Sequence, residues 1–171
     1  EIIRGSPLLV QIMIFYFVLG TTMNSILMMN GIPKLNPEWY GIMALSVFTG
    51  AYVVEIVRAG IEAIHPGQVE AARSQGMTYF QCMFHIILPQ ALKRVLPPLA
   101  NEFINTLKYS AIVSVISIQE LTFQAMQVMA ATHVTIEVWL TVTAIYLVMC
   151  MMLSFGVRWL DGRSRGMSVS A

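Results

Sequence analysis

The chain has 171 residues, of which 57% are hydrophobic and 11% charged, and its formal net charge is +1 at pH 7. Soluble domains carry roughly 25% charged residues, so this composition excludes a soluble globule. No dense basic patch is present to bind nucleic acid. The two cysteines, Cys82 and Cys150, form neither a disulfide framework nor a metal-ligand pattern, and we expect both to be buried apolar residues.

Four apolar segments follow one another along the chain, at residues 5–33, 39–61, 95–118 and 138–157. Each reaches the about 20 residues that cross a hydrocarbon layer about 30 Å thick. Before the second segment, Asn36-Pro37-Glu38 is typical of a helix start, because proline is tolerated at the first helical position. The sequence therefore predicts an all-α membrane protein with four spans. We expect one membrane domain over residues 1–162 and a short, polar, disordered tail over residues 163–171.

Basic residues are concentrated on one side of these spans. They lie at positions 4, 73, 93, 94, 158, 163 and 165. The segments 20–38 and 116–137, which we predict to include the outer loops, contain only Lys34. The positive-inside bias therefore predicts that residues 62–94 and the C-terminus face the cytoplasm.

Residues 70–89, EAARSQGMTYFQCMFHIILP, form the most specific motif and match E-A-A-x3-G-x9-I-x-L-P at every specified position. Gly76 permits a backbone turn that other residues resist, and Pro89 suits a helix start. We predict two short helices joined at Gly76 by a rigid turn. Glu70 either stabilises this turn or pairs with an arginine of a partner.

The second half of the motif predicts an apolar helical stripe. Its members, at positions i, i+3, i+4 and i+7, are Phe80, Met83, Phe84 and Ile87. For Ile86, Ile87 and Leu88 we favour packing against the protein's own spans. For residues 74–80, which lie farthest from the spans, we favour contact with a partner protein.

Three further segments carry a family resemblance: residues 1–11 (EIIRGSPLLVQ), 54–68 (VEIVRAGIEAIHPGQ) and 101–110 (NEFINTLKYS). Together with residues 70–89 they make nearly the whole chain resemble the polar amino acid permeases of the histidine/glutamine type, which belong to ABC importers. Ser6 stands where threonine is usual. Tyr109 and Ala111 depart from the K-D-T-S-L continuation of the family, which leaves the substrate open rather than the family.

The resemblance implies a multi-span type I importer permease fold in a bacterial inner membrane. Five spans are expected, so residues 1–162 are an N-terminally incomplete membrane domain. This fits a chain that begins with Glu1 and has no leader. The resemblance also implies a second permease subunit, identical or different, a cytoplasmic dimer of ATP-binding subunits and an extracytoplasmic amino acid-binding protein.

The ATP-binding subunit is expected to dock on the E-A-A motif. The coupling residues implied are Glu70, Ala71, Ala72, Gly76, Tyr79, Phe80 and Pro89. No G-x-x-x-x-G-K-[ST] phosphate loop is present, so we expect no enzyme activity and no cofactor in this chain. ATP and Mg²⁺ belong to the partner subunit.

Ionisable residues inside spans are costly and mark functional or pairing sites. Asn101, Asn105 and Lys108 share one helical face, which offers donors and acceptors for the carboxylate and ammonium of an amino acid. The expected substrate path consists of Asn101, Glu102, Asn105, Lys108 and Glu55. Alternatively, Glu55 or Glu102 pairs with Arg58 or Lys108 to fix helix packing. We expect no metal site among the three histidines.

Other functions stay open on the residues alone. A secondary carrier or channel could use the intramembrane charges as an ion relay, but it would not need a docking turn. A membrane scaffold could recruit an ATPase without transporting anything. Export, or uptake of an opine-like or sulfur-containing analogue, is also compatible, and the sequence does not choose among acidic, basic and neutral amino acids.

Overall fold

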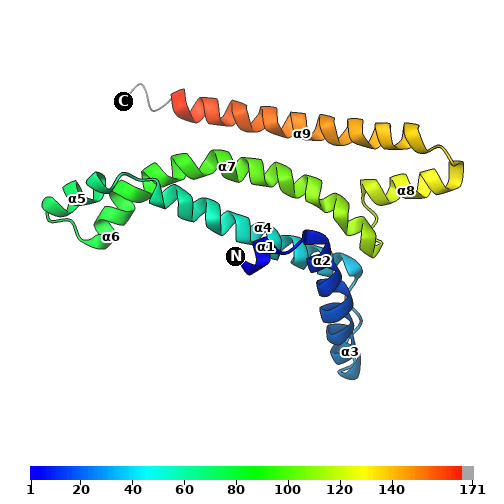
Figure 1. The fold of residues 1–171 in the computed structure, drawn as a ribbon. Coiled ribbons are helices and arrows are strands. Elements are labelled where there is room, and N and C mark those ends of the chain that lie inside the picture. The colour runs from blue at the N-terminus through cyan, green and yellow to red at the C-terminus, as the bar shows by residue number, and fades with distance from the viewer. Residues whose placement is uncertain (167–171) are drawn as a thin grey trace. The chain divides into compact units, whose positions relative to one another are not determined.

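Helices form every regular element of residues 1–166, the part of the chain that the computed structural model describes, with side chains described through Trp159 (Figure 1). In chain order the elements are α1 (Ile2–Gly5), α2 (Leu8–Met13), the π-helix η1 (Ile14–Gly20), α3 (Thr21–Met29), α4 (Pro37–Glu62), α5 (Pro66–Ser74), α6 (Tyr79–Cys82), the π-helix η2 (Met83–Ile87), α7 (Leu88–Tyr109), the 3₁₀-helix η3 (Ser110–Ile116), α8 (Leu121–Thr132) and α9 (Thr135–Gly166). The predicted all-α class is confirmed.

Three helical stretches are long and apolar enough to cross a membrane: Leu8–Met29, Pro37–Glu62 and Thr135–Trp159, with mean hydropathies of 1.7, 1.6 and 2.1. They confirm three of the predicted spans, and α4 begins at Pro37 as predicted. The predicted span over residues 95–118 behaves differently. Its helix, Tyr79–Ile116, qualifies only together with α8, from which it is bent by 49°.

The segment between the last two predicted spans contains α8, a helix that the sequence reasoning missed. Glu120 begins it by accepting hydrogen bonds from the backbone N–H groups of Thr122 (2.8 Å) and Phe123 (2.7 Å). His133 ends it with a left-handed backbone at φ 59°. The predicted outer loop within residues 116–137 thus contains a helix, which the acidic cap before an apolar run indicates. At the other end of the chain, residues 163–166 of the predicted tail continue α9, and residues 167–171 lie outside the described residues.

The chain divides into two units, which are described separately. The first comprises Glu1–Ala51 and Ile104–Phe155. In it α2 packs against η3, and η3 packs against α8. The rings of Phe48 and Tyr109 meet edge to face at 5.5 Å, and the hydroxyls of Thr49 and Thr106 lie 3.2 Å apart. These contacts join α4 to the end of α7. The buried apolar side chains of this unit are Leu8, Ile12, Tyr40, Ala44, Phe48, Ile104, Val113, Ile116, Ala125 and Val142.

The second unit includes Tyr52–Phe103. Here the second half of α4 approaches α7 closely at Gly60. A Cβ atom at that position would lie 2.1 Å from Cγ2 of Val95, which is closer than real atoms come. Arg94 of α7 also donates a hydrogen bond to the carbonyl of Ala63, just beyond the end of α4. Gly60 therefore permits the close contact between α4 and α7. The E-A-A motif lies in the segment that connects these two helices.

Candidate functional site

The helix α5 of the E-A-A motif has a defined start. His65 precedes it, and its Nδ1 atom accepts a hydrogen bond from the backbone N–H of Gly67 at 3.1 Å. Pro66 occupies the first turn, where its missing N–H costs nothing. His65 is thus a capping residue, because its ring accepts a hydrogen bond from one of the N–H groups that lack a partner at the start of α5.

Gly76 makes the turn that separates α5 from α6, as predicted from the motif. Its φ is +80°, a conformation that favours glycine, and a Cβ there would meet nothing within 4 Å. Thr78 and Gln81 then form a capping box: Gln81 Oε1 accepts from the N–H of Thr78 at 2.9 Å, and Thr78 Oγ1 accepts from the N–H of Gln81 at 3.4 Å. Both helix ends at the turn are therefore locally determined. In Figure 1, α5 and α6 lie side by side at the end of α4 and α7 where the chain passes from one to the other.

A small apolar core supports this turn. Its buried members are Ile64, Ala72, Cys82, Ile87 and Ala91, and Ile61, Val69, Met77, Met83 and Ile86 pack against them. The core confirms that Cys82 is a buried apolar residue and that Ile86 and Ile87 pack within the protein. Cys150, which was also expected to be buried, is only half-buried. Ala72 belongs to the core, whereas its motif neighbours Glu70 and Ala71 are exposed.

The other side of the turn presents aromatic rings. Tyr79, Phe80 and Phe84 are 60%, 71% and 63% exposed. The predicted four-residue stripe is therefore divided, because Met83 and Ile87 pack inward while Phe80 and Phe84 do not. Residues 83–87 are π-helical, and their wider turns break the α-helical spacing on which the stripe prediction relied.

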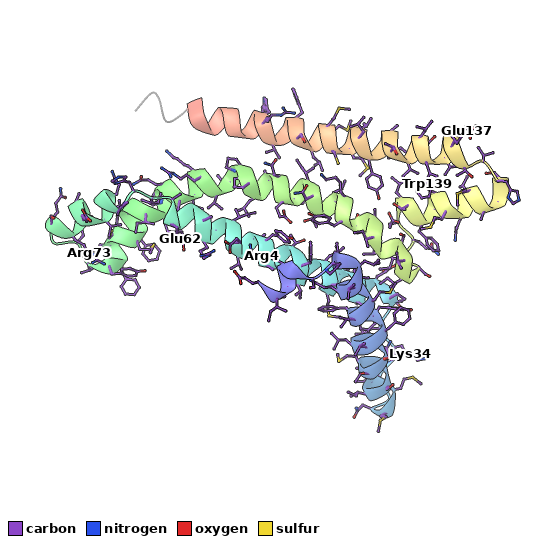
Figure 2. The ribbon with its side chains drawn as sticks, in the orientation of Figure 1. Arg4, Lys34, Glu62, Arg73, Glu137 and Trp139 are labelled. Atoms are coloured by element: carbon purple, nitrogen blue, oxygen red, sulfur yellow. The ribbon has the colours of Figure 1, made fainter. Side chains whose placement is uncertain are left out.

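A hollow of about 380 Å³ lies at the turn, lined by Gln75, Gly76, Met77, Gln81 and His85. Arg73, near the end of α5, is exposed beside it (Figure 2). The carboxylate of Glu70 is exposed and forms no hydrogen bond or ion pair with any described residue. The turn thus offers aromatic rings and both charge signs to its surroundings.

The polar residues predicted for the substrate path all lie on α7, except Glu55. Glu102 is buried at 6% exposure and Asn105 is half-buried. Asn101 and Lys108 are exposed, and Lys108 forms no ion pair with a residue of the described chain.

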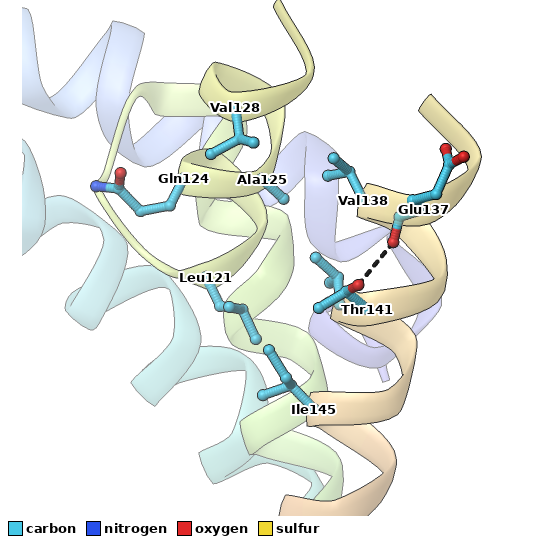
Figure 3. Close-up of a pocket in the computed structure, with 9 residues that line it drawn as sticks. Leu121, Gln124, Ala125, Val128, Glu137, Val138, Thr141 and Ile145 are labelled. Atoms are coloured by element: carbon cyan, nitrogen blue, oxygen red, sulfur yellow. Dashed lines mark hydrogen bonds between the residues drawn. The ribbon is translucent and has the colours of Figure 1, made fainter. Parts of the chain in front are cut away.

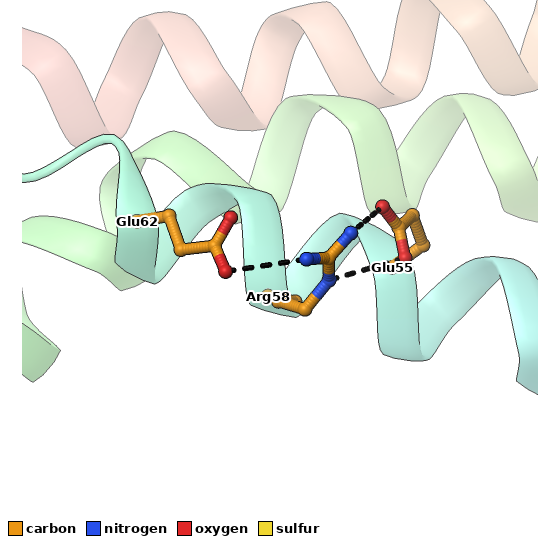
Figure 4. A network of polar contacts seen from close by, with 3 residues as sticks. All are labelled: Glu55, Arg58 and Glu62. Carbon is orange, nitrogen blue, oxygen red and sulfur yellow. Dashed lines mark hydrogen bonds and ion pairs between the residues drawn. The ribbon is translucent and has the colours of Figure 1, made fainter.

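Glu55 belongs to an ion-pair cluster along α4 (Figure 4). The guanidinium of Arg58 contacts both carboxylate oxygens of Glu55, and its Nη1 atom lies 3.3 Å from Oε1 of Glu62. The side chains of Arg58 and Glu62 are 57% and 63% exposed, and that of Glu55 is 33% exposed. Their positions, three and four residues apart, allow these contacts within one helix.

A second polar group, between α8 and α9, was not predicted. The hydroxyl of Tyr146 donates to Oε2 of Glu120 at 3.0 Å and lies 3.2 Å from Oγ1 of Thr122. The same carboxylate caps α8. One acidic side chain thus joins the start of α8 to the middle of α9.

Next to this polar group, α8 and α9 line a largely apolar groove of about 350 Å³ (Figure 3). Its apolar walls are Leu121, Ala125 and Val128 from α8 and Val138, Val142 and Ile145 from α9. The polar side chains in the lining are those of Gln124, Glu137 and Thr141, and the Thr141 hydroxyl donates to the backbone carbonyl of Glu137 at 2.7 Å.

Comparisons with known proteins extend over nearly the whole chain. The family model described as "binding-protein-dependent transport system inner membrane component" matches residues 1–166. The probable glutamine ABC transporter permease protein GlnM of Bacillus subtilis is 44% identical over 163 residues, which are 95% of this chain and 71% of that protein. The arginine transport system permease protein ArtQ of the same organism is 39% identical, over 91% of this chain and 67% of that protein. A crystal structure of an amino acid ABC transporter with histidines has a TM-score of 0.81 and 45% identity, over 95% of this chain and 72% of that chain.

Proposed function

This chain belongs to the family of binding-protein-dependent transport system inner membrane components, and we propose that it is the permease subunit of an ATP-driven amino acid importer. The family resemblance and the helical type I permease fold expected from the sequence are confirmed. Relatives named for glutamine and arginine transport support an amino acid as the substrate. Membership of this family argues against a self-sufficient carrier.

The observation that carries the proposal is the rigid turn with its exposed aromatic rings. We propose that a cytoplasmic ATP-binding subunit docks on the motif residues Glu70, Ala71, Ala72, Gly76, Tyr79, Phe80 and Pro89. This role is supported by the exposure of Tyr79 and Phe80 and by a Glu70 carboxylate that forms no hydrogen bond or ion pair with the described residues. Ala72 contributes differently, since it packs the turn onto its core. ATP and Mg²⁺ are then bound and used by the partner subunit.

The remaining assembly follows from the same proposal. A second permease subunit, identical or different, completes the path, and an extracytoplasmic binding protein delivers the amino acid. The turn and the C-terminus face the cytoplasm of a bacterial cell, and the α3–α4 connection faces outward. The basic residues at positions 73, 93 and 94 support this orientation.

Within the permease, the polar residues of α7 are the proposed substrate path. Lys108 supplies a cation for the substrate carboxylate, and Glu102, Asn101 and Asn105 supply acceptors for its ammonium. The support is the helical spacing of Asn101, Asn105 and Lys108, together with the lack of any ion pair between Lys108 and a described residue. For Glu55, the ion pair with Arg58 favours the alternative role of stabilising α4.

Substitution of Gly76 tests the coupling role. In vesicles containing the assembled transporter, Gly76→Val is expected to separate ATP hydrolysis from uptake, because a β-branched residue at φ +80° costs roughly 1–3 kcal/mol and displaces the turn. Gly76→Asn should retain most coupling, since asparagine tolerates the left-handed conformation. Uptake and ATPase rates are measured together.

Gly31 provides the matched control. It has a φ of +71° and equally open surroundings, but it lies in the α3–α4 connection. Gly31→Val should therefore carry a similar backbone cost without uncoupling. Normal substrate-stimulated uptake by Gly76→Val, or equal uncoupling in both valine variants, would remove the docking role from the turn.

A further inference from the structure

A cavity of about 370 Å³ opens where the first candidate span meets the second, far along the chain from the E-A-A motif. Its lining includes Tyr16, Phe17, Thr21, Asn24, Lys34 and Tyr40. Pro37, which begins α4, also lines it, so the cavity lies at the membrane-interface end of that span. Lys34 is exposed in the connection between α3 and α4 (Figure 2).

A partly buried group of hydrogen bonds lies in the lining of the cavity. Tyr40 is 1% exposed, and its hydroxyl donates to Oδ1 of Asn24 at 3.0 Å. The backbone N–H of Leu35 donates to the same oxygen at 2.9 Å. Because a backbone N–H can only donate, the atom that faces Leu35 must be the amide oxygen. The amide NH₂ of Asn24 therefore remains a donor, and no described residue accepts from it.

Two further donors complete an anion-binding set. Lys34 forms no ion pair with any described residue, and the hydroxyl of Tyr16 forms no hydrogen bond within residues 1–166. The N-terminal end of the 26-residue helix α4 adds a partial positive charge beside Pro37. Glu38 follows Pro37 but is exposed and does not line the cavity.

The surroundings decide which anion fits. Phe17 lines the cavity and is 56% exposed, and its neighbour Val18 is 57% exposed. Both lie on Leu8–Met29, whose apolar window is only 11% buried. A phosphate group in the cavity could thus be joined to acyl chains lying along this span, whereas a soluble anion would leave the apolar face uncovered.

We propose that this cavity binds the headgroup of an anionic phospholipid, with Lys34, Asn24 and Tyr16 as donors to its phosphodiester. The lipid would bind at the end of the span that we propose faces outward. Neither the amino acid path nor the E-A-A turn takes part, so this site stands or falls independently of the proposed function.

Competition between lipids tests the site. The assembled transporter is placed in nanodiscs of phosphatidylglycerol and phosphatidylcholine, and the lipids that remain bound after extraction are counted by native mass spectrometry. Lys34→Gln is expected to reduce the preference for phosphatidylglycerol by about tenfold or more, because it removes the charge-assisted contact between the ammonium and the phosphodiester. Tyr16→Phe keeps the ring contacts with Phe17 and Tyr40 and should reduce the preference to a smaller extent.

Lys93→Gln is the matched control, because Lys93 is also exposed and has no ion pair with the described residues. The Lys93→Gln variant should prefer phosphatidylglycerol to the same degree as the unmodified protein. Equal losses in Lys34→Gln and Lys93→Gln would indicate bulk surface charge and overturn the site. Unchanged lipid retention in Lys34→Gln would also overturn it. A simultaneous loss of affinity for the extracytoplasmic binding protein would then assign the cavity to protein docking.

Discussion

Lys108 lies near the end of α7 and forms no ion pair with any described residue. If it receives a substrate carboxylate, Lys108→Met removes a charge-assisted contact worth roughly 1.5–3 kcal/mol. We therefore expect substrate-dependent ATPase stimulation to require about 10- to 100-fold more substrate, or to favour other amino acids, while the complex still assembles. Titration of ATPase activity with several amino acids measures this.

Two outcomes would assign Lys108 elsewhere. Unchanged stimulation and unchanged substrate preference would remove it from the path. Failure to assemble, rescued by neutralising Glu102 as well, would give it a role in helix packing instead. Lys93→Met, on the same helix, controls for loss of charge alone.

Individual residues differed in how far the sequence revealed their roles. Gly76 was predictable because a glycine between two helical patterns requires a special backbone conformation, and the Glu55–Arg58 pair follows from spacing within one helix. The Glu120–Tyr146 contact was not predictable, since its partners are 26 positions apart and lie on different helices, one capping α8 and the other within α9. Exposure also escaped prediction, because Phe80 of the apolar stripe is exposed whereas Ile87 of the same stripe is buried.

The close packing of α4 against α7 depends on the absence of a side chain at Gly60. Gly60→Ala would place a Cβ 2.1 Å from Cγ2 of Val95, a stiff side chain that cannot turn aside. Overpacking of this kind costs roughly 1–3 kcal/mol, so the purified protein should unfold at lower temperature. Gly50→Ala on the same helix meets nothing within 4 Å and should not lower the melting temperature. Equal melting of the two variants would show that the helices can separate freely.

The contact between α8 and α9 includes a hydrogen bond from the hydroxyl of Tyr146 to the carboxylate of Glu120. Tyr146→Phe removes the donor to Glu120 and leaves the ring in place, so we expect a loss of about 1 kcal/mol, the usual scale for hydrogen bonds within membranes. Thr143→Val is the control, because its hydroxyl bonds only to the carbonyl of Trp139 in its own helix. Denaturant unfolding in detergent compares them. A Tyr146→Phe protein as stable as Thr143→Val would mean that the contact contributes nothing.

For the molecule as a whole, orientation in the membrane is the expectation most directly open to measurement. Single cysteines at positions 36 and 133 should react with an impermeant reagent added outside, and one at Ser74 only from the cytoplasm. The physical reason is the cost of moving the basic cluster at positions 73, 93 and 94 across the bilayer. A cysteine at Ser74 that is labelled from outside would reverse the orientation and exclude the docking of a cytoplasmic ATPase on the turn.

At this scale the sequence predicted the helical class, three spans and the position of the turn, because apolar length and motif spacing are local properties. It did not predict that the chain from Tyr79 to Ile116 becomes span-like only with α8. That arrangement depends on the left-handed Ser117, at φ 61°, and on a carboxylate cap, neither of which changes the average hydropathy.

The exposed side chains of Asn101 and Lys108 should also affect how stable a newly synthesised subunit is before it meets its partners. Lipid can cover bare leucines and valines, but it cannot solvate these groups, so a subunit that leaves the translocon alone displays them to membrane proteases. We expect the proposed second permease subunit to cover these groups. An unassembled subunit should therefore be degraded faster than an assembled one, so that its cellular abundance falls when its partners are deleted.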